Sequence, residues 1–312
     1  MSLVINHNLM AMNSARNLST AYSDLAGSTE KLSSGQRINS AADDAAGLAI
    51  RELMRADIAS LNQGVRNAND AISLIQTADG ALGVIDEKLI RMKELAEQAA
   101  TGTYTSDQRL IIDSEYQAMA SEITRIAKAT DFNGIQLLDG NLSANSATAA
   151  ASEWGGNHVG SSMTPTGSLK VHFGTANDSD QDYYYIAIND ATASALGVGN
   201  NADIDRSSYE GGYAISTQHA AQNALEGLNA AILSKDNIRA NLGALQNRLE
   251  NTISNLEIQA ENLQAAESRI SDVDVATEMT EFTRNQIKSQ AAVAMLAQAN
   301  SLPQMAMQLI GG

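Results

Sequence analysis

The chain has 312 residues, with 20 basic and 36 acidic side chains and a formal net charge of −16. This balance lacks the basic surface that nucleic acids require, so a nucleic-acid-binding protein is excluded. The sequence contains no cysteine, which excludes disulfides, zinc–thiolate sites and cysteine nucleophiles.

The composition favours long helices. Only 4% of the residues are aromatic and only 2 are proline, while alanine supplies much of the 44% hydrophobic content. Alanine has high helix propensity but little surface to bury, so slender bundled helices are expected rather than a thick core. No apolar run approaches the roughly 20 residues of a membrane span, so no membrane partner is expected. The first residues also lack the features of a cleaved signal peptide.

The first predicted helix covers residues 5–32 and ends near Gly35. Apolar residues recur in it at three- and four-residue spacing, which is typical of one buried stripe, and glycine can take the left-handed conformation that ends a helix. The stripe includes Ile5, Leu9, Leu18 and Leu25.

The stretch SSGQRINSAADDAAGLAI that follows is interpreted as a joint between two helices. After Gly35, Ser40 is expected to begin the second helix, with Asp43 closing a capping box and Asp44 also complementing the helix dipole. The residues Ala45, Ala46 and Gly47 then present almost no side chain, so a neighbouring helix could approach closely. The alternative interpretation is an ordinary alanine-rich surface helix.

The next pattern predicts a helix of about 45 residues that ends before Gly102. Apolar residues follow heptad spacing from Ile58 to Leu82, with Asp79 in one seam position, and the register slips by one residue near Ile85. A third helix is expected to start at Ser106 as its cap and to carry Leu110, Met119, Ile123 and Ile126. It ends before a tight turn at Asn133–Gly134, followed by a short strand over Ile135–Leu138.

Residues 141–213 lose the helical periodicity, and two alternating segments, SLKVHFG and DYYYIAIND, predict strands. We expect this insert to have its own aromatic core. Helical patterns return in residues 238–270 and in a last helix, whose apolar residues include Phe282, Ile287, Met295 and Leu302.

The two halves of the chain therefore mirror each other, and pairing them buries their stripes. The predicted fold is mainly α, a long antiparallel helical bundle or coiled coil of paired N- and C-terminal halves with a small β-containing insert. The predicted domains are a terminal coiled-coil domain (1–40 with 271–312), a long-helix bundle with a short β-hairpin (41–140 with 214–270) and an exposed variable insert (141–213).

No residue pattern predicts catalysis, a cofactor or a metal. The four histidines are scattered and no HExxH motif is present. Alternating Asp178, Asp180 and Asp182 could supply oxygen ligands to calcium, but an EF-hand loop would need glycine and glutamate where Tyr183 and Asn189 stand. A solvated acidic turn is the favoured interpretation, and the protein is expected not to be an enzyme.

Several long motifs resemble bacterial flagellin. They include INHNLMAMNSARNLS, LSSGQRINSAADDAAGLAI, the FNG turn and SRISDVDVATEMTEFTRNQIKSQAAVAMLAQANSLPQ, in the family's order. The resemblance covers about the first 140 and the last 95 residues. It implies a self-assembling filament subunit for swimming motility, in which the terminal helices pair at the filament core and fold on assembly. The residues expected to form polymerisation contacts are then the apolar ones named above in these helices: Ile5, Leu9, Leu18, Leu25, Phe282, Ile287, Met295 and Leu302. It also implies secretion in unfolded form to the bacterial flagellum without a cleaved signal peptide.

The resemblance further implies partners: other copies of the chain, hook-associated and cap proteins, and an export chaperone that binds the C-terminal segment. It also implies recognition by a host Toll-like receptor, for which Arg91, Leu95 and Glu122 match the family's contact residues. The alternatives are a hook–filament junction protein, which shares similar terminal helices, a flagellin with a protease in its insert, and a cytoplasmic coiled-coil adaptor. The FNG turn and the C-terminal motif favour flagellin.

Overall fold

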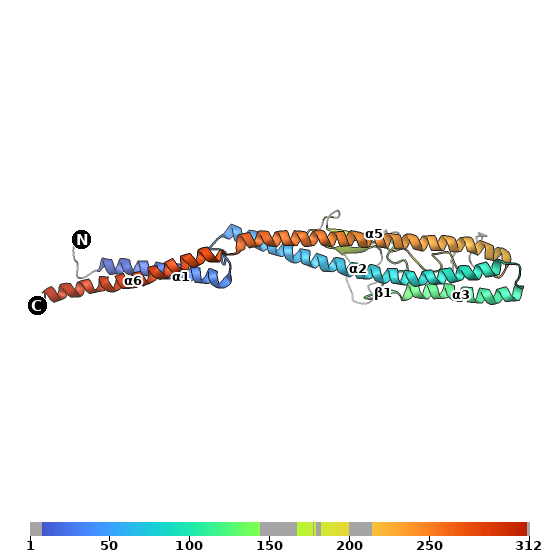
Figure 1. Ribbon diagram of the computed structural model, residues 1–312, viewed down its shortest axis with the longest axis horizontal. Helices are drawn as coiled ribbons and strands as arrows, with labels where there is room; N and C mark the ends of the chain where they lie inside the picture. The colour runs from blue at the N-terminus through green and yellow to red at the C-terminus, as the bar shows by residue number, and fades with distance from the viewer. Residues whose placement is uncertain (1–7, 144–166, 177, 179–181, 200–213, 311–312) are drawn as a thin grey trace, which may run out of the picture. The chain divides into compact units, whose positions relative to one another are not determined.

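The computed structural model describes residues 8–143, 167–176, 178, 182–199 and 214–310, with the side chains of 302, 303 and 306–310 left out. The helices are α1 Leu9–Ser34, α2 Ala45–Ala100, α3 Ser106–Ala129, α5 Gln218–Ser271 and α6 Val275–Ile310 (Figure 1). Two antiparallel two-stranded sheets pair β1 Asp131–Phe132 with β2 Ile135–Gln136, and β3 Leu169–His172 with β4 Tyr183–Ile186. The predicted fold class, mainly α with a small β-containing insert, is confirmed. Among the helices so described, none is both long and apolar enough to cross a membrane.

Contacts divide the chain into two compact units. The terminal unit comprises Met1–Ala59 with Ala260–Gly312, and the central unit comprises Ser60–Gln259. Helices α2 and α5 each run from one unit into the other, because no proline interrupts them. The division into three domains at the predicted bounds stays a prediction.

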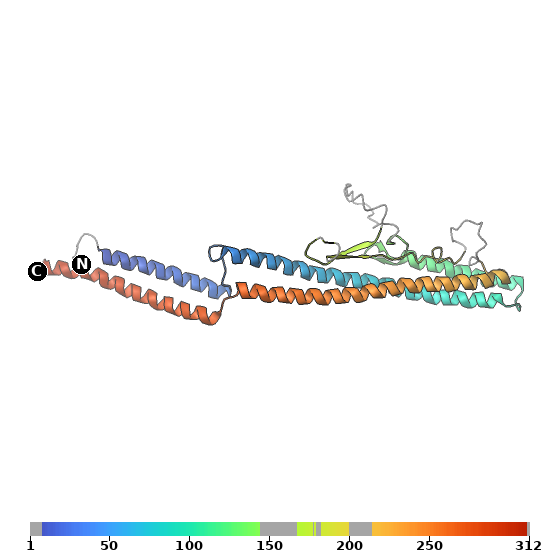
Figure 2. The ribbon, with the colours of Figure 1, turned by 90° about the horizontal axis from the view of Figure 1, so that it is seen from above.

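The core of the central unit lies between α2, α3 and α5, which run side by side (Figures 1 and 2). The predicted heptad seam of α2 is confirmed, and its later residues are all fully buried, namely Leu82, Ile85, Leu89, Met92, Ala96 and Ala99. The predicted register slip near Ile85 is wrong. Ala71 and Ala78, rather than Ile72 and Asp79, are the buried residues before Leu82, so the heptad spacing continues unbroken. A second row, with Leu74 and Leu95, is also buried because α2 packs against two helices rather than one. At 56 residues, α2 is longer than the roughly 45 expected.

Helix α3 differs from the prediction at its first residues. Thr105 rather than Ser106 is the cap, since its hydroxyl accepts from the Gln108 N–H and the Gln108 side chain accepts from the Thr105 N–H. Leu110, expected in the buried stripe, is 56% exposed. The buried face carries Ile112 and Tyr116 instead.

The predicted tight turn at Asn133–Gly134 is confirmed. Both residues have positive φ, 53° and 80°, as the two-residue turn between β1 and β2 requires. The Gly134 N–H also donates to Asp131 Oδ2 at 3.1 Å. The predicted strand is shorter than expected, because Leu137 and Leu138 leave the sheet and enter the helical core.

Both strands predicted in the insert are confirmed, as β3 and β4. The prediction that the insert has its own core is wrong for the part that the structure describes. Val171 and Ile186 on this hairpin belong to the same buried cluster as the α2 residues. Tyr184 stacks on the Arg248 guanidinium of α5, 3.5 Å from its ring centroid. The strands are too short to bury their apolar face without the helices.

Polar side chains of α2 hold the backbone of the β3–β4 hairpin. Asn67 Nδ2 donates to the His172 carbonyl at 2.8 Å, and Ser60 Oγ donates to the Gly174 carbonyl at 3.4 Å. Gly64 permits this approach, because a Cβ there would lie 2.1 Å from the Phe173 carbonyl oxygen. The glycine is therefore required by packing and not by its φ angle.

We predict that Gly64→Ala separates the hairpin from α2 and lowers the free energy of unfolding, by about 1–3 kcal/mol as for other overpacked sites. Gly80→Ala is the matched control. Among the described residues, no atom outside its own stretch of helix lies within 4 Å of its Cβ position, so the substitution should stabilise the helix by about 0.5–1 kcal/mol. Urea unfolding followed by circular dichroism measures both. Equal behaviour of the two variants would contradict the close-approach interpretation.

Candidate assembly and recognition surfaces

The joint between α1 and α2 is held by the turn between α5 and α6. Gly35 caps α1 with φ 71° and donates its N–H to the Lys31 carbonyl at 2.9 Å, which confirms its predicted role. The Arg37 N–H then donates to the Ser271 carbonyl at 2.6 Å, and its guanidinium donates to the Ile270 carbonyl at 2.7 Å. The two chain segments that enter the terminal unit are thus tied to each other.

The prediction that Ser40 begins a helix is wrong. Residues 41–43 form a turn, in which Asp43 Oδ2 accepts from the Ser40 N–H at 2.9 Å and the Asn39 N–H at 3.1 Å. These backbone hydrogen bonds, Ser40 first, lower the pKa of Asp43. The helix begins at Ala45, and Asp44 is its cap, with Oδ1 accepting from the Gly47 N–H at 2.9 Å. The prediction failed because a serine followed three residues later by an acidic residue can close a turn as well as cap a helix.

The small-residue face of the joint is only partly used within the chain. Gly47 is buried, and a Cβ there would lie 2.7 Å from Ile38 Cδ1 and 2.5 Å from Asp44 Oδ2. Ala45 and Ala46 are exposed. Their contact with a neighbouring helix stays a prediction.

Arg51 is a joint residue that the sequence did not reveal. Its side chain is only 8% exposed, although α2 is open to solvent around it. Its Nη1 donates to the Ile38 carbonyl at 2.7 Å and to Gln36 Oε1 at 3.1 Å, while Glu52 neutralises its charge at 2.9 Å. An arginine in an amphipathic helix is ordinarily a surface residue, so only the folded loop shows this function.

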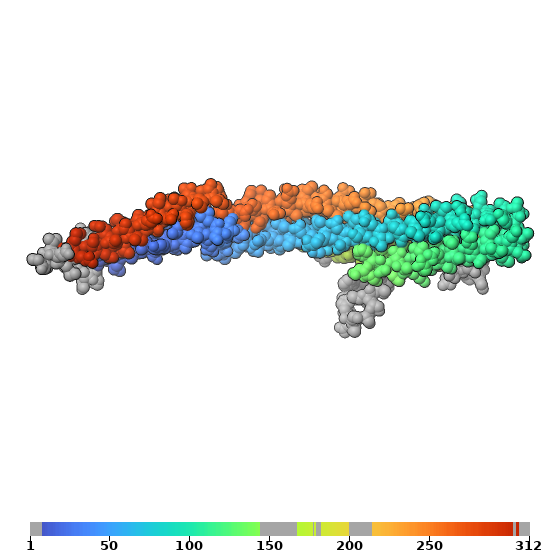
Figure 3. All heavy atoms as spheres, turned by 60° about the horizontal axis from the view of Figure 1, so that its bottom comes forward, coloured from blue at the N-terminus to red at the C-terminus, as the bar shows by residue number. Residues whose placement is uncertain are grey.

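The seam between α1 and α6 is built from small and polar residues. The two helices lie side by side (Figures 1 and 3), and their buried residues are Ala21, Ser28, Asn285, Ser289 and Ala299. Asn8 Nδ2 donates to the Ala299 carbonyl at 2.7 Å, and Asn285 Nδ2 donates to Ser28 Oγ at 3.5 Å. Such a seam removes little apolar area from water.

The predicted polymerisation residues divide between this seam and the opposite faces. Leu18, Leu25 and Phe282 are half-buried beside the seam. The other large residues point away from it: Leu9 is 66% exposed, Ile287 62% and Met295 60%. Ile5 lies outside the described residues, as does the side chain of Leu302 in α6. Each terminal helix therefore carries an apolar face that its partner helix does not cover.

The three residues matched to receptor recognition occupy different environments. Arg91 is half-exposed on α2 and binds Glu115 of α3 at 2.9 Å and Glu94 at 2.9 Å. Glu122 binds Arg125 at 2.6 Å, and this hydrogen bond lowers the pKa of Glu122. Leu95, however, is only 1% exposed. Its assignment as a surface contact is wrong, because its side chain fills the core between the helices.

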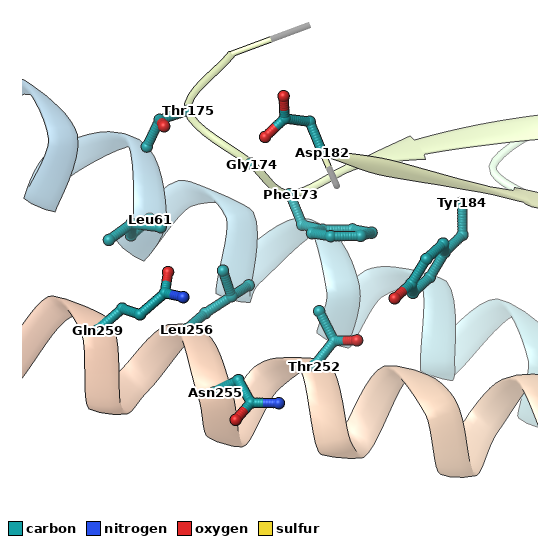
Figure 4. Close-up of a pocket in the computed structure, with 10 residues that line it drawn as sticks. All are labelled: Leu61, Phe173, Gly174, Thr175, Asp182, Tyr184, Thr252, Asn255, Leu256 and Gln259. Carbon is teal, nitrogen blue, oxygen red and sulfur yellow. The ribbon is translucent and has the colours of Figure 1, made fainter. Parts of the chain in front are cut away.

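One pocket of the central unit, of about 290 Å³, lies where the β3–β4 hairpin meets α2 and α5 (Figure 4). Phe173 and Tyr184 point from the hairpin toward α5. Asp182 lines it too, but its carboxylate already accepts from the Asp178 N–H at 2.8 Å, which closes a turn. Across the described ranges no cluster of acidic and histidine side chains could hold a metal ion.

Comparison with known proteins identifies the family. The model of the bacterial flagellin N-terminal helical region matches residues 5–143, and that of the C-terminal helical region matches residues 225–310. The flagellin of Bacillus subtilis is 43% identical over 98% of this chain and 99% of its own length. The chain belongs to the bacterial flagellin family.

Other relatives agree with this assignment. A flagellar filament 33 kDa core protein of Treponema phagedenis is 41% identical over 99% of this flagellin and 100% of its own length. A putative flagellar hook-associated protein of Vibrio parahaemolyticus has a similar structure, with a TM-score of 0.52, 12% identity, and coverage of 74% of this chain and 100% of its own, which shows a shared fold alone. Flagellins are structural proteins of the extracellular flagellar filament, so the chain is a filament subunit.

We predict that Ile287→Ser abolishes or slows polymerisation while the unfolding transition of the monomer stays unchanged, because this side chain touches solvent rather than the α1–α6 seam. The control is Gln286→Ser, which changes the neighbouring exposed polar residue. This variant should polymerise normally. Seeded assembly followed by light scattering and electron microscopy measures both variants. Normal filaments from Ile287→Ser would contradict the assigned role of the uncovered face.

Proposed function

We propose that this flagellin polymerises by packing the uncovered apolar faces of α1 and α6 against the same helices of neighbouring copies. The observation that supports this is the contrast between the two sides of each helix. Small and polar residues meet in the seam, while Leu9, Met12, Ile287 and Met295 are 60% exposed or more. Fully burying such a side chain contributes about 1.5–3 kcal/mol of free energy. Burial of a few of them between copies would therefore contribute more than the contacts of the α1–α6 seam.

The same contrast supports folding of the terminal helices on assembly. Ordering one residue of backbone costs about 1–2 kcal/mol, and helices without tertiary packing are marginal in water. The seam of α1 and α6 offers little apolar area against that cost, whereas the central unit buries long rows of leucine and isoleucine. Subunits that stack head to tail supply the missing area and propagate a helical tube.

Export in unfolded form follows from the same physics. Terminal segments that are marginally stable alone can remain extended during secretion, and a chaperone that covers the apolar face of α6 prevents premature assembly. The exposed side chains available to it include Val293, Met295 and Met305. Hook-associated and cap proteins bind the same terminal faces at the two ends of the filament. A hook–filament junction role is the less favoured alternative, because relatives at about 40% identity over the whole chain are named flagellins or filament core proteins.

Recognition by a host Toll-like receptor is proposed for the surface formed by α2 and α3 around Arg91. A guanidinium held by Glu94 and Glu115 is preorganised to present its remaining donor face to a partner. Exposed Ile90 and Ile111 on the same two helices add apolar contact area. Glu122 contributes charge on α3, and Leu95 supports the surface from beneath.

We predict that deleting residues 291–312 yields a soluble, largely helical protein that cannot polymerise and no longer binds its export chaperone. The central unit retains its core, so its thermal unfolding should be preserved. Sedimentation measures polymerisation, and a pull-down with purified chaperone measures chaperone binding. Loss of both in one truncation supports the proposal that both use the apolar face of α6. Filaments formed from the truncated protein would rule it out.

For receptor recognition, we predict that Arg91→Ala lowers monomer-induced receptor signalling by about tenfold or more, as for a central interface arginine worth 1.4 kcal/mol or above. Arg66→Ala is the control, since Arg66 is an exposed arginine of α2 whose guanidinium donates to Gln63 of its own helix and to no other residue that the structure describes. A reporter-cell dose–response curve measures both. Indistinguishable curves for the two variants would remove Arg91 from the recognition surface.

A further inference from the structure

A ladder of polar contacts crosses between α2 and α5 beside their apolar seam. Arg239 binds Asp79 through Nε at 2.7 Å and Nη2 at 3.2 Å, and Lys235 binds Asp86. The third contact is from Lys93 Nζ to Asn229 Oδ1 at 2.8 Å. On α2 these residues, 79, 86 and 93, recur at the seven-residue spacing of a heptad.

Lys235 is the most deeply buried charge of the ladder. Its side chain is 2% exposed, and its ammonium also lies 2.8 Å from Asp236 Oδ1. A buried ammonium is strongly unfavourable unless a carboxylate faces it, whereas a well-packed apolar residue in its place would often be at least as stable. A lysine at this position therefore matters less for stability than for specificity, because it disfavours other arrangements of the two helices.

We propose that the Lys235–Asp86 and Arg239–Asp79 pairs set the antiparallel register of α2 against α5. The apolar seam alone leaves this register weakly specified, because alanine, leucine and isoleucine recur along both helices. Sliding the helices by one heptad brings similar apolar residues together again. The charges do not match again after a slide, because Asp79 and Asp86 on α2 are followed at the same spacing by Lys93, and at the other end by Ile72. They therefore distinguish the native register from its neighbours.

A slide in either direction leaves one cation of α5 without a carboxylate on α2. In one direction Lys235 meets Lys93, a like charge, while Arg239 takes Asp86. In the other direction Lys235 takes Asp79, and Arg239 meets Ile72. Polar residues at seam positions of coiled coils specify register in the same manner, at some expense of stability. This inference does not depend on how the subunits assemble.

Electron-spin distance measurements on the full-length monomer test the proposal. Because the chain has no cysteine, spin labels attach only at introduced Asn69→Cys and Ser234→Cys, which are exposed positions of α2 and α5. The labels are offset along the helices, so a one-heptad slide changes their separation by roughly 10 Å at 1.5 Å per residue. The native pairs should give one narrow distance.

The unlocking variant Asp79→Leu, Asp86→Leu, Lys235→Met and Arg239→Met should add a second distance or broaden the first. The milder variant Asp86→Leu with Lys235→Met should do so to a smaller extent and decides the question if the fourfold variant does not fold. Glu122→Leu with Arg125→Met, a surface pair within α3, is the control and should keep the native distance. One unchanged narrow distance in the unlocking variants would overturn the proposal. Failure of both to fold would also overturn it, by showing that the pairs act through stability.

Discussion

The packing of α2 against α3 and α5 is the interaction on which the rest of the molecule depends. It buries the long rows of leucine, isoleucine and alanine that form the core of the central unit. The β1–β2 turn, the β3–β4 hairpin and the surface around Arg91 are all attached to these helices, and none has a separate core in the described residues. Polar side chains of α2 position the elements packed against it: Asn67 holds the hairpin backbone, and Asp79 and Asp86 face the cations of α5.

The terminal unit solves a different problem with the same secondary structure. Its helices meet through alanine, serine and asparagine and leave larger side chains such as Leu9 and Ile287 in solvent. Within one subunit this arrangement is unfavourable, because an apolar face that stays in water contributes no hydrophobic stabilisation. In a filament the same faces are available to neighbouring copies, as the mode of assembly proposed above requires.

Several local features were predictable because short-range geometry decides them. Gly35 had to cap α1, and Asn133–Gly134 had to form a tight turn, since few residues adopt positive φ. The heptad of α2 was also readable, because burial follows helical periodicity. Its predicted slip near Ile85 was wrong, because the buried residues before Leu82 are Ala71 and Ala78 and not the larger Ile72 beside them. The joint was harder: Ser40 and Asp43 fit both a capping box and a turn, and only the observed hydrogen bonds separate them.

The sequence by itself determined the helical class, the paired halves, the two short strands of the insert and the family, because each depends on local propensity or on long quoted motifs. Only the tertiary structure decided which face of each helix is covered. Leu95 is core because α2 has two partner helices, Arg51 is buried because the joint loop folds over it, and Gly64 is needed because a hairpin distant in sequence lies against it. Periodicity reports that a face is apolar, but the partner that covers it is set by contacts between residues far apart in the chain.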